Sequence, residues 1–262
     1  MSKISNTFKK LRSTGSKAFI PYIMAGDPSL QETKKFVLEL AEAGADIIEL
    51  GVPFSDPLAD GPTIQRAAER AIAQGVTLRK VLVLVAEIRQ VSQIPLILMT
   101  YYNPVFKFGI EAFAKEASRA GVNGLIIPDL IPDEAEELLH AARQNGIDTI
   151  FLLAPTSTED RIKKVVKATT GFVYYVSITG TTGAKLLVDE TMKNTLNQIR
   201  SFTHKPIEVG FGVSGPEDAK SVAAIADGVI VGSAIVKLIA EGKNIKEFAQ
   251  SLRNAISTKN EL

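Results

Sequence analysis

The chain has 262 residues and a formal net charge of +1, with 45% apolar and 23% charged residues. This composition is ordinary for a globular protein with a sizeable core, and the near-neutral charge argues against nucleic acid as a partner. The absence of cysteine excludes disulfides, thiolate metal sites and cysteine nucleophiles, and it fits a reducing compartment. No stretch approaches the roughly 18 uninterrupted apolar residues that span a bilayer.

The N-terminal stretch "MSKISNTFKKLRSTGSK" is basic and free of acidic residues, as transit peptides are. However, Ile4, Phe8 and Leu11 recur at helical spacing, and a strand pattern begins at Ala18. This spacing favours a short amphipathic helix that covers an apolar surface of the fold. We therefore expect a cytoplasmic protein.

Short apolar runs, several of them rich in β-branched residues, recur along the chain. Near-continuous apolarity, rather than strict alternation, is typical of strands buried on both faces of a parallel sheet. The pattern predicts eight strands, within residues 18–26, 45–51, 94–102, 122–129, 147–155, 171–178, 206–212 and 227–233.

Helical patterns lie between these strands. Examples are a helix opened by Pro132-Asp133 and ended by Gly146, one between Ser157 and Gly171, and one with a Ser214 to Glu217 capping box. Strand–helix alternation over this length predicts a (β/α)₈ TIM barrel in a single domain, residues 1–262, with an extended loop and extra helix after the second strand. The alternative, a doubly wound open sheet, lacks a G-x-G-x-x-G motif after the first strand.

The second strand and its loop read "IELGVPFSDPLADG" and contain three carboxylates. Glu49 lies within the strand, where burial would raise its pKa towards neutrality and suit it to proton transfer. The structural alternative, pairing with a lysine or arginine of the barrel core, lacks a partner in the predicted strands. Asp60 follows on a loop that could close over a ligand, whereas Asp56 before Pro57 is better interpreted as a turn former.

Glycines follow the last three predicted strands, at Gly183, Gly212 and Gly232-Ser233. Each alone could serve a turn. Together they indicate a phosphate site, because barrels often bind phosphate after strands seven and eight beside a short helix, here "AIVKLIAEG".

Histidine chemistry is not indicated, since His140 lies in a helical pattern and His204 precedes Lys205-Pro206. Neither a histidine-based triad nor a histidine metal cluster is therefore expected. Four aromatic residues end strands or follow them and could line a slot for a flat apolar ligand, namely Tyr22, Tyr101, Tyr174 and Phe211.

The motif "ELGVPFSDPLADG" matches every fixed position of the signature E-L-G-x-P-[FY]-S-D-P-x-A-D-G. The chain resembles the tryptophan synthase alpha chain family over its whole length, through "PYIMAGDPS", "MTYYNPVFKFG", "GLIIPDLIPDEA", "TGTTGA", "GFGVS" and "VGSAIVKLI". The resemblance implies a lyase that cleaves indole-3-glycerol phosphate into indole and glyceraldehyde 3-phosphate by a retro-aldol reaction, without a cofactor in this chain.

The resemblance also assigns roles to residues. Glu49 matches the acid/base that protonates indole C3 and takes the glycerol hydroxyl proton, and Asp60 matches the carboxylate that binds the indole N–H. Thr182 matches a threonine that closes onto the aspartate. The phosphate site corresponds to Gly183, Gly212, Gly232 and Ser233. The indole pocket and its surroundings correspond to Tyr22, Met99, Ile126, Asp129, Tyr174 and Phe211.

This chain departs from the family pattern in three places. Many members have phenylalanine where Tyr22 stands and leucine where Met99 stands, which changes the shape of the indole slot. Some members carry an arginine where this chain has Ile178, and no closing role is transferred to that position.

The resemblance implies a partner, a tryptophan synthase beta chain that carries pyridoxal phosphate (PLP) and receives indole through a tunnel, in an alpha2beta2 heterotetramer. The loop with Asp56 and Pro57, together with the sixth loop, matches the side that faces this partner. Three alternatives stay open: a stand-alone indole-3-glycerol phosphate lyase, a phosphate-binding barrel isomerase or epimerase, and a non-catalytic subunit that only activates its partner.

Overall fold

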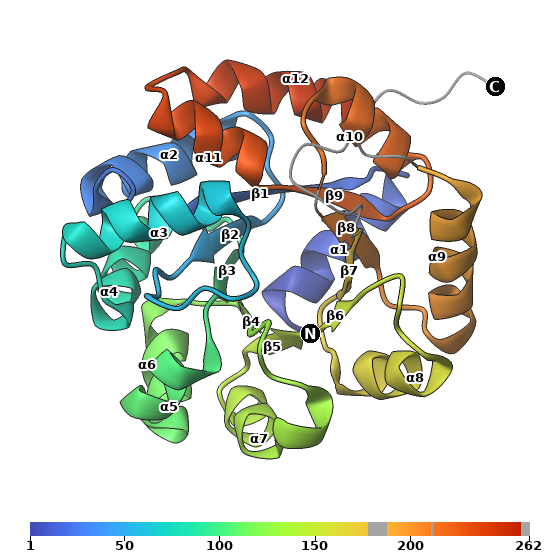
Figure 1. Cartoon of the computed structure of the whole chain (residues 1–262), viewed down its shortest axis with the longest axis horizontal. Coiled ribbons are helices and arrows are strands. Elements are labelled where there is room, and N and C mark those ends of the chain that lie inside the picture. The colour runs from blue at the N-terminus through green and yellow to red at the C-terminus, as the bar shows by residue number, and fades with distance from the viewer. Residues whose placement is uncertain (178–187, 211, 258–262) are drawn as a thin grey trace.

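The computed structural model describes residues 1–177, 188–210 and 212–257. Its strands are all parallel and run in the order β5-β4-β3-β2-β1-β9-β8-β7-β6. β5 and β6 are separated only by Phe151, so the two ends of this order are one interrupted strand and the sheet closes into a barrel (Figure 1). The strands are β1 (Ala18–Met24), β2 (Ile48–Gly51), β3 (Leu96–Met99), β4 (Gly124–Ile126), β5 (Asp148–Ile150), β6 (Leu152–Leu153), β7 (Val173–Val176), β8 (Ile207–Gly210) and β9 (Gly228–Val231).

The register gives the stagger of the barrel. One row of paired residues runs from Tyr22 through Glu49 to Asp148, and a second runs from Leu152 through Glu208 to Ala18. The rows are offset by four residues along the fifth strand and by four along β1. A total stagger of eight residues is the shear of a TIM barrel. The predicted α/β barrel of eight strands is thus confirmed, with its fifth strand in two pieces.

Helices form a ring outside the strands (Figure 1). The extra helix predicted after the second strand is α3, which precedes α4. The helices are α1 (Lys3–Ser13), α2 (Leu30–Glu42), α3 (Pro62–Ala73), α4 (Leu78–Arg89), α5 (Tyr102–Phe108), α6 (Ile110–Ala120), α7 (Glu136–Gln144), α8 (Glu159–Ala168), α9 (Glu190–Phe202), α10 (Pro216–Ala223), α11 (Ser233–Ala240) and α12 (Ile245–Ser257), with a 3₁₀ turn at η1 (Pro132–Glu134).

The N-terminal helix closes one end of the barrel. Figure 1 shows α1 inside the ring of outer helices, across the strands. Its buried residues Ile4, Phe8 and Leu11 join the apolar cluster of the barrel interior, and the rings of Phe8 and Phe172 meet edge to face at 5.7 Å. The predicted amphipathic helix is confirmed. Because α1 precedes β1, it packs at the N-terminal ends of the strands. It leaves uncovered the C-terminal ends, where TIM barrels have their active sites.

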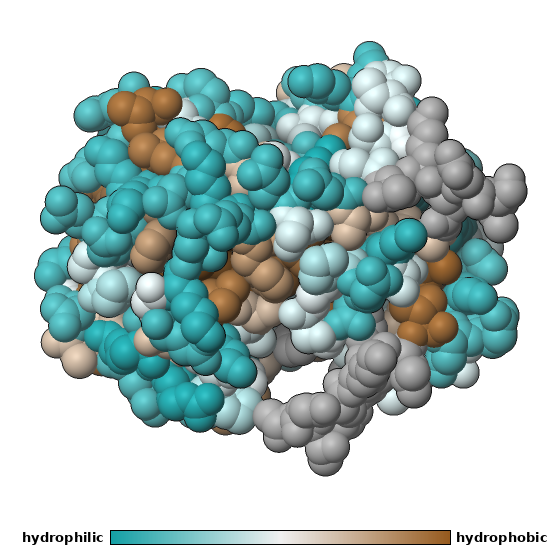
Figure 2. All heavy atoms as spheres, turned by 90° about the horizontal axis from the view of Figure 1, so that it is seen from above, coloured by the Kyte–Doolittle hydropathy of each residue, from teal (hydrophilic) through white to brown (hydrophobic). Residues whose placement is uncertain are grey.

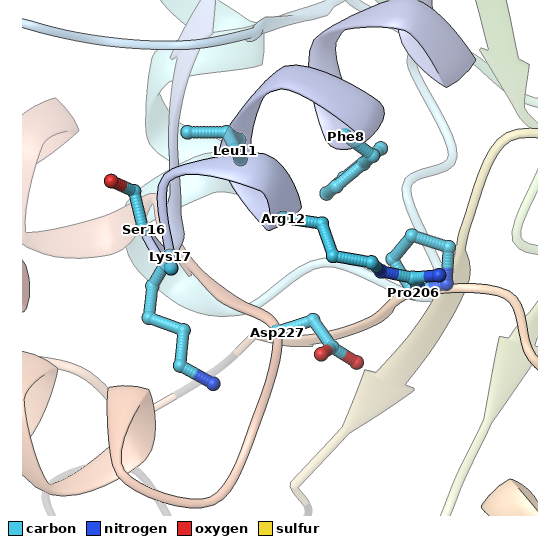
Figure 3. Close-up of a pocket in the computed structure, with 8 residues that line it drawn as sticks. Phe8, Leu11, Arg12, Ser16, Lys17, Pro206 and Asp227 are labelled. Carbon is cyan, nitrogen blue, oxygen red and sulfur yellow. The ribbon is translucent and has the colours of Figure 1, made fainter.

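A small pocket of about 140 Å³ lies beside the C-terminal half of α1 (Figure 3). The Lys17 ammonium reaches the backbone oxygen of Ala226 at 2.6 Å, and Arg12 donates to the backbone oxygen of His204 at 3.3 Å. The pocket therefore belongs to the closed end of the barrel. Its lining includes Phe8, Leu11, Arg12, Lys17, Pro206 and Asp227.

Two local predictions need correction. The Ser214 capping box is wrong, because Gly215 is the residue that precedes α10 and the Ser214 hydroxyl instead donates to the Asp218 carboxylate at 2.5 Å. The helix predicted from Pro132 is divided at Ala135 into η1 and α7.

The outer faces of the helices are mostly polar, as expected for helices that bury one stripe. Figure 2 shows one side of the molecule, where hydrophilic side chains predominate and apolar ones form separate patches. Among the described residues, no helix is long and apolar enough to cross a membrane.

Candidate active site

Glu49 lies in the middle of the barrel wall with its side chain buried. It sits in β2 between Ile48 and Leu50, and its neighbour across the sheet is Tyr22 of β1. Alternation along the strand places Ile48 and Leu50 among the apolar residues under the helices, so Glu49 points to the barrel interior. Only 1% of Glu49 is exposed, and both carboxylate oxygens are without a hydrogen-bond partner among the described residues. Such a group is available to a ligand that enters the barrel mouth.

Asp60 approaches from the loop between β2 and α3. A turn at Asp56 precedes it, in which the Leu58 N–H donates to the Asp56 backbone oxygen at 3.0 Å. The predicted turn at Asp56 is therefore present. The hydroxyl of Tyr101, which follows β3, hydrogen-bonds the Asp60 carboxylate and accepts the Ala59 N–H at 3.0 Å. Tyr101 thus fixes both the backbone and the side chain of this loop.

The two carboxyl groups have different proton affinities. Burial, and secondarily the charge of Asp60, raises the pKa of Glu49 to about 8. Burial also raises the pKa of Asp60, to about 6, and the Tyr101 hydrogen bond opposes that rise. Near pH 7, Glu49 is therefore mainly protonated and Asp60 mainly ionised. Two carboxyls with separated pKa values can serve as an acid and as an anionic hydrogen-bond acceptor.

Two tyrosines flank Glu49 inside the barrel. A side chain at Gly51 would collide with the Tyr22 hydroxyl, and one at Gly210 would collide with the Tyr174 hydroxyl. The Tyr22 ring therefore packs against Gly51 at the end of β2, and the Tyr174 ring packs against Gly210 at the end of β8. Burial raises the pKa of Tyr22 and of Tyr174 well above 10, with further contributions from the charges of Glu49 and Asp60, so both hydroxyls stay protonated.

An apolar wall completes the interior. Met99 and Ile126 are paired in register at the ends of β3 and β4, and both belong to or pack against the interior cluster. Met99 is half-buried and Ile126 is fully buried. Together with Tyr22 and Tyr174, they give this part of the barrel interior a mostly apolar lining.

Asp129 follows β4 and has a clear local partner. Its two carboxylate oxygens accept the Tyr102 N–H at 2.9 and 3.2 Å, at the start of α5. This contact holds the segment that begins with Tyr102, next to Tyr101.

Three of the predicted phosphate residues, Gly212, Gly232 and Ser233, lie at the ends of β8 and β9. Gly212 has a φ of 78°, which favours glycine, and Gly232 precedes α11 without a side-chain cap. Among the described residues, no side chain caps the first N–H groups of α11, from Ser233 onward, so these groups can bind an anion. A Cβ at Gly232 would contact Tyr22 at 3.4 Å, so this helix start is close to the interior tyrosine.

Three predicted site residues, Thr182, Gly183 and Phe211, lie outside the described residues, as does Ile178. The two histidines of the chain, His140 and His204, are both exposed. Across residues 1–177, 188–210 and 212–257, no three His, Cys, Asp or Glu side chains are grouped as a metal site would require.

Sequence reasoning missed the role of Tyr101, which it counted only as one of four aromatics. It also missed Glu208, a fully buried carboxylate on β8 whose two oxygens have no hydrogen-bond partner among the described residues. The signal for Glu208 was present, since "PIEVG" has a glutamate two residues before a strand-ending glycine, as does "IIELG".

Comparison with known proteins shows the family of the chain. The family model described as "Tryptophan synthase alpha chain" matches residues 8–262. The chain belongs to the tryptophan synthase alpha chain family. A tryptophan synthase alpha chain from Geotalea uraniireducens is 54% identical over 94% of this chain and 93% of its own length. One from Geobacter sulfurreducens is 50% identical over 98% and 99%.

Solved structures agree with these relatives. The tryptophan synthase alpha chain of Legionella pneumophila superposes with a TM-score of 0.91 at 36% identity, over 100% of both chains. A chain of Mycobacterium tuberculosis tryptophan synthase gives a TM-score of 0.92 at 38% identity, over 98% of this chain and 99% of that one.

Membership in the tryptophan synthase alpha chain family establishes the reaction. The chain is a lyase of tryptophan biosynthesis that cleaves indole-3-glycerol phosphate. In this family the alpha chain carries no cofactor of its own, because PLP belongs to the beta chain, and a beta chain is the partner. The sequence prediction of family, fold and reaction is confirmed.

Proposed function

We propose that Glu49 carries the protons of the cleavage reaction and that Asp60 stabilises the charged indole ring. The supporting observation is the pair itself, in which a buried carboxyl with a pKa of about 8 lies near a second carboxyl with a pKa of about 6. At neutral pH this pair provides one acid and one anion, which is the combination that the cleavage of a carbon–carbon bond at indole C3 needs.

The proton balance closes on Glu49. Protonated Glu49 donates its proton to indole C3, which forms a C–H bond and leaves a positively charged ring. The resulting carboxylate takes the proton of the hydroxyl on the carbon attached to the ring. The electron pair of that O–H bond forms the aldehyde of glyceraldehyde 3-phosphate, the carbon–carbon bond breaks, and its electrons return to the ring. Indole leaves, and Glu49 is protonated again.

Asp60 acts on the other side of the ring system. Its carboxylate accepts the indole N–H, whose acidity rises when C3 is protonated, so the hydrogen bond is strongest in the charged intermediate. An interaction that strengthens along the reaction path accelerates it, whereas equal binding of all states does not. The Tyr101 hydrogen bond supports this role because it keeps Asp60 ionised and oriented.

The remaining predicted residues bind the two ends of the substrate. Tyr22, Met99, Ile126 and Tyr174 surround the indole ring, with Asp129 and Phe211 nearby. Gly212, Gly232 and Ser233 bind the phosphate through backbone N–H groups at the start of α11, together with Thr182 and Gly183 from the sixth loop. The uncapped start of α11 beside Tyr22 supports this assignment.

The beta chain partner binds at the same end of the barrel in this proposal. Leu58, Phe106 and Ile131 are large apolar side chains exposed by 84%, 62% and 36%, and they follow β2, β3 and β4 in turn. Exposed apolar residues that follow neighbouring strands, two of them in loops and Phe106 in α5, are typical of interaction surfaces. An alpha2beta2 heterotetramer, a cytoplasmic location and a single domain over residues 1–262 complete the proposal.

A direct assay tests it. The purified chain is supplied with indole-3-glycerol phosphate, and glyceraldehyde 3-phosphate is measured with and without an added beta chain. We expect slow cleavage by the isolated chain and a marked rise with the partner. Fast release of free indole without any gain from the beta chain would instead establish a stand-alone lyase, and a partner gain without cleavage would establish a non-catalytic activating subunit.

A further inference from the structure

An ion pair between a buried carboxylate and a half-exposed arginine joins the loop after β1 to helix α3. The Arg70 guanidinium donates from Nε to Asp27 Oδ1 and from a terminal nitrogen to Asp27 Oδ2, both at 2.7 Å. Asp27 is only 2% exposed. Both carboxylate oxygens are thus bound by one planar fork, which fixes direction as well as distance. This pair lies outside the substrate-binding and catalytic residues assigned above.

Helix α3 has few other strong anchors. Its buried side chains are Ile64 and three alanines, and its N-cap, Gly61, makes no side-chain hydrogen bond. Because an alanine removes much less apolar surface from water than a leucine, this face contributes little free energy and little positional specificity. Among the contacts that α3 makes with other described residues, the fork at Arg70 is therefore the most directional.

Helix α3 helps to position Asp60, beside the hydrogen bonds of Tyr101. The helix begins at Pro62, and the Gln65 side-chain amide in its first turn donates to the Asp60 backbone oxygen at 2.8 Å. The helix also packs against β1 and α11, and α11 starts at the proposed phosphate residues. A shift of α3 would therefore move Asp60 relative to both ends of the substrate.

The loop that holds Asp27 is itself constrained. The Gly26 N–H donates to the buried hydroxyl of Thr33 at 2.9 Å. The Val76 side chain, just beyond α3, occupies the space that a Cβ at Gly26 would need. The loop after β1 thus binds Arg70 through Asp27 and packs against Val76 at Gly26. These contacts attach the C-terminal half of α3 to the end of β1.

We propose that Asp27 and Arg70 are positioning residues for the cleavage reaction, which hold α3 so that Asp60 meets the indole N–H. This inference rests on the proposed role of Asp60. A displacement of about 1 Å at a reacting group can cost on the order of 100-fold in rate. The ion pair therefore contributes to catalysis through geometry rather than through contact with the substrate.

The test compares Arg70→Met, Arg70→Lys, Asp27→Asn and the double variant Asp27→Asn/Arg70→Met with wild type. Arg66→Met is the matched control, because Arg66 is an exposed arginine on the same helix. Cleavage of indole-3-glycerol phosphate is measured as kcat and KM from pH 5 to 9, with concentrations corrected to folded protein by circular dichroism.

We expect Arg70→Met and Asp27→Asn to lower kcat/KM by about 10- to 100-fold. Lysine at position 70 restores part of the loss, because it keeps the charge but not the fork. The double variant is about as impaired as either single variant, since both lose one interaction. In Arg70→Met, Asp60 is less enclosed, its pKa falls, and the acidic limb of the pH profile moves to lower pH.

A purely structural role would reduce the folded fraction and leave KM and the pH profile of the folded enzyme unchanged, and this result would overturn the inference. Wild-type kinetics in Arg70→Met, combined with inactive Asp60→Asn, would overturn the inference and leave the proposed function intact. If Asp60→Asn were fully active, both would fail. Arg66→Met is expected to match wild type.

Discussion

The Tyr101 hydroxyl hydrogen-bonds the carboxylate of Asp60, and the oxygen of this hydroxyl also accepts the backbone N–H of Ala59 at 3.0 Å. Tyr101 comes from the end of β3, so this contact ties the Asp60 loop to a different strand from the one that carries Glu49. The ring of Tyr101 also lies 5.2 Å from that of Phe54, within the same loop. The loop is therefore attached to the barrel wall at its middle as well as at its ends.

Replacing this tyrosine tests the attachment. In Tyr101→Phe the hydrogen bond that lowers the Asp60 pKa is lost, so that pKa rises above about 6. Because Asp60 must be ionised to accept the indole N–H, the acidic limb of kcat/KM moves to higher pH, and activity at pH 7 falls about 10-fold, a typical loss for one charge-assisted bond. A pH profile of cleavage checks this. An unmoved acidic limb would show that Tyr101 does not tune Asp60.

Asp60→Asn should change both limbs of the profile. The acidic limb disappears, because the group that must lose a proton is gone. The alkaline limb, which reports the loss of the Glu49 proton, moves to lower pH, because the charge of Asp60 no longer raises the Glu49 pKa. The measurement is the pH profile of kcat/KM for the residual cleavage activity of this variant. Wild-type rates in this variant would remove Asp60 from the mechanism.

Glu208 provides a prediction about stability rather than activity. Burial raises its pKa well above 4.5, and the charges of Asp227 and Asp46 add to this rise. Its folded-state pKa exceeds its unfolded-state pKa, so its contribution is fully favourable below about pH 4.5 and is lost as pH rises through the folded value. Glu208→Gln removes this dependence. The free energy of unfolding of the variant minus that of wild type, measured by urea denaturation, should therefore be more favourable to the variant at pH 8 than at pH 5.

The same experiment has a clear negative outcome. An equal difference between variant and wild type at both pH values would show that Glu208 does not change its protonation on folding. Cleavage activity should be retained, because the charges that act on Glu208 belong to residues at the closed end of the barrel, Asp46, Asp227 and Lys17, and not to Glu49.

The partner surface can be tested at Phe106. A charge at this exposed position, as in Phe106→Asp, should weaken binding of the beta chain by about 30-fold, the effect of losing a hot spot of ~2 kcal/mol. Val83→Asp is the control, since Val83 is 59% exposed on the outer helix α4. Titration calorimetry with the beta chain measures both. Equal affinity of the two variants would place the interface elsewhere.

Much of this architecture could be predicted from local patterns. The eight strands, the helix that closes the barrel, and Glu49 inside β2 all follow from which residues are apolar and at what spacing. The side-chain contacts could not, because they join residues far apart in sequence: Tyr101 reaches Asp60 and Arg70 reaches Asp27 only after the barrel has closed.

Stagger explains the different environments of the two similar glutamates. Glu208 pairs across β9 with Ala18, at the start of β1, whereas Glu49 pairs with Tyr22, four residues further along. At about 3.3 Å per residue this offset is roughly 13 Å. Glu208 therefore lies towards the closed end and Glu49 towards the mouth. The capping box failed for a different reason, because the hydroxyl of Ser214 has an alternative acceptor in Asp218.

The most direct test of the central claim is the turnover of Glu49→Gln, measured as glyceraldehyde 3-phosphate formed from indole-3-glycerol phosphate by the folded variant with the beta chain present. Glutamine has almost the same shape but cannot donate and recover a proton as a carboxyl group does. We predict that kcat falls by a factor on the order of 10² to 10⁴, with little change in KM. Turnover close to wild type in a folded Glu49→Gln protein would contradict the account.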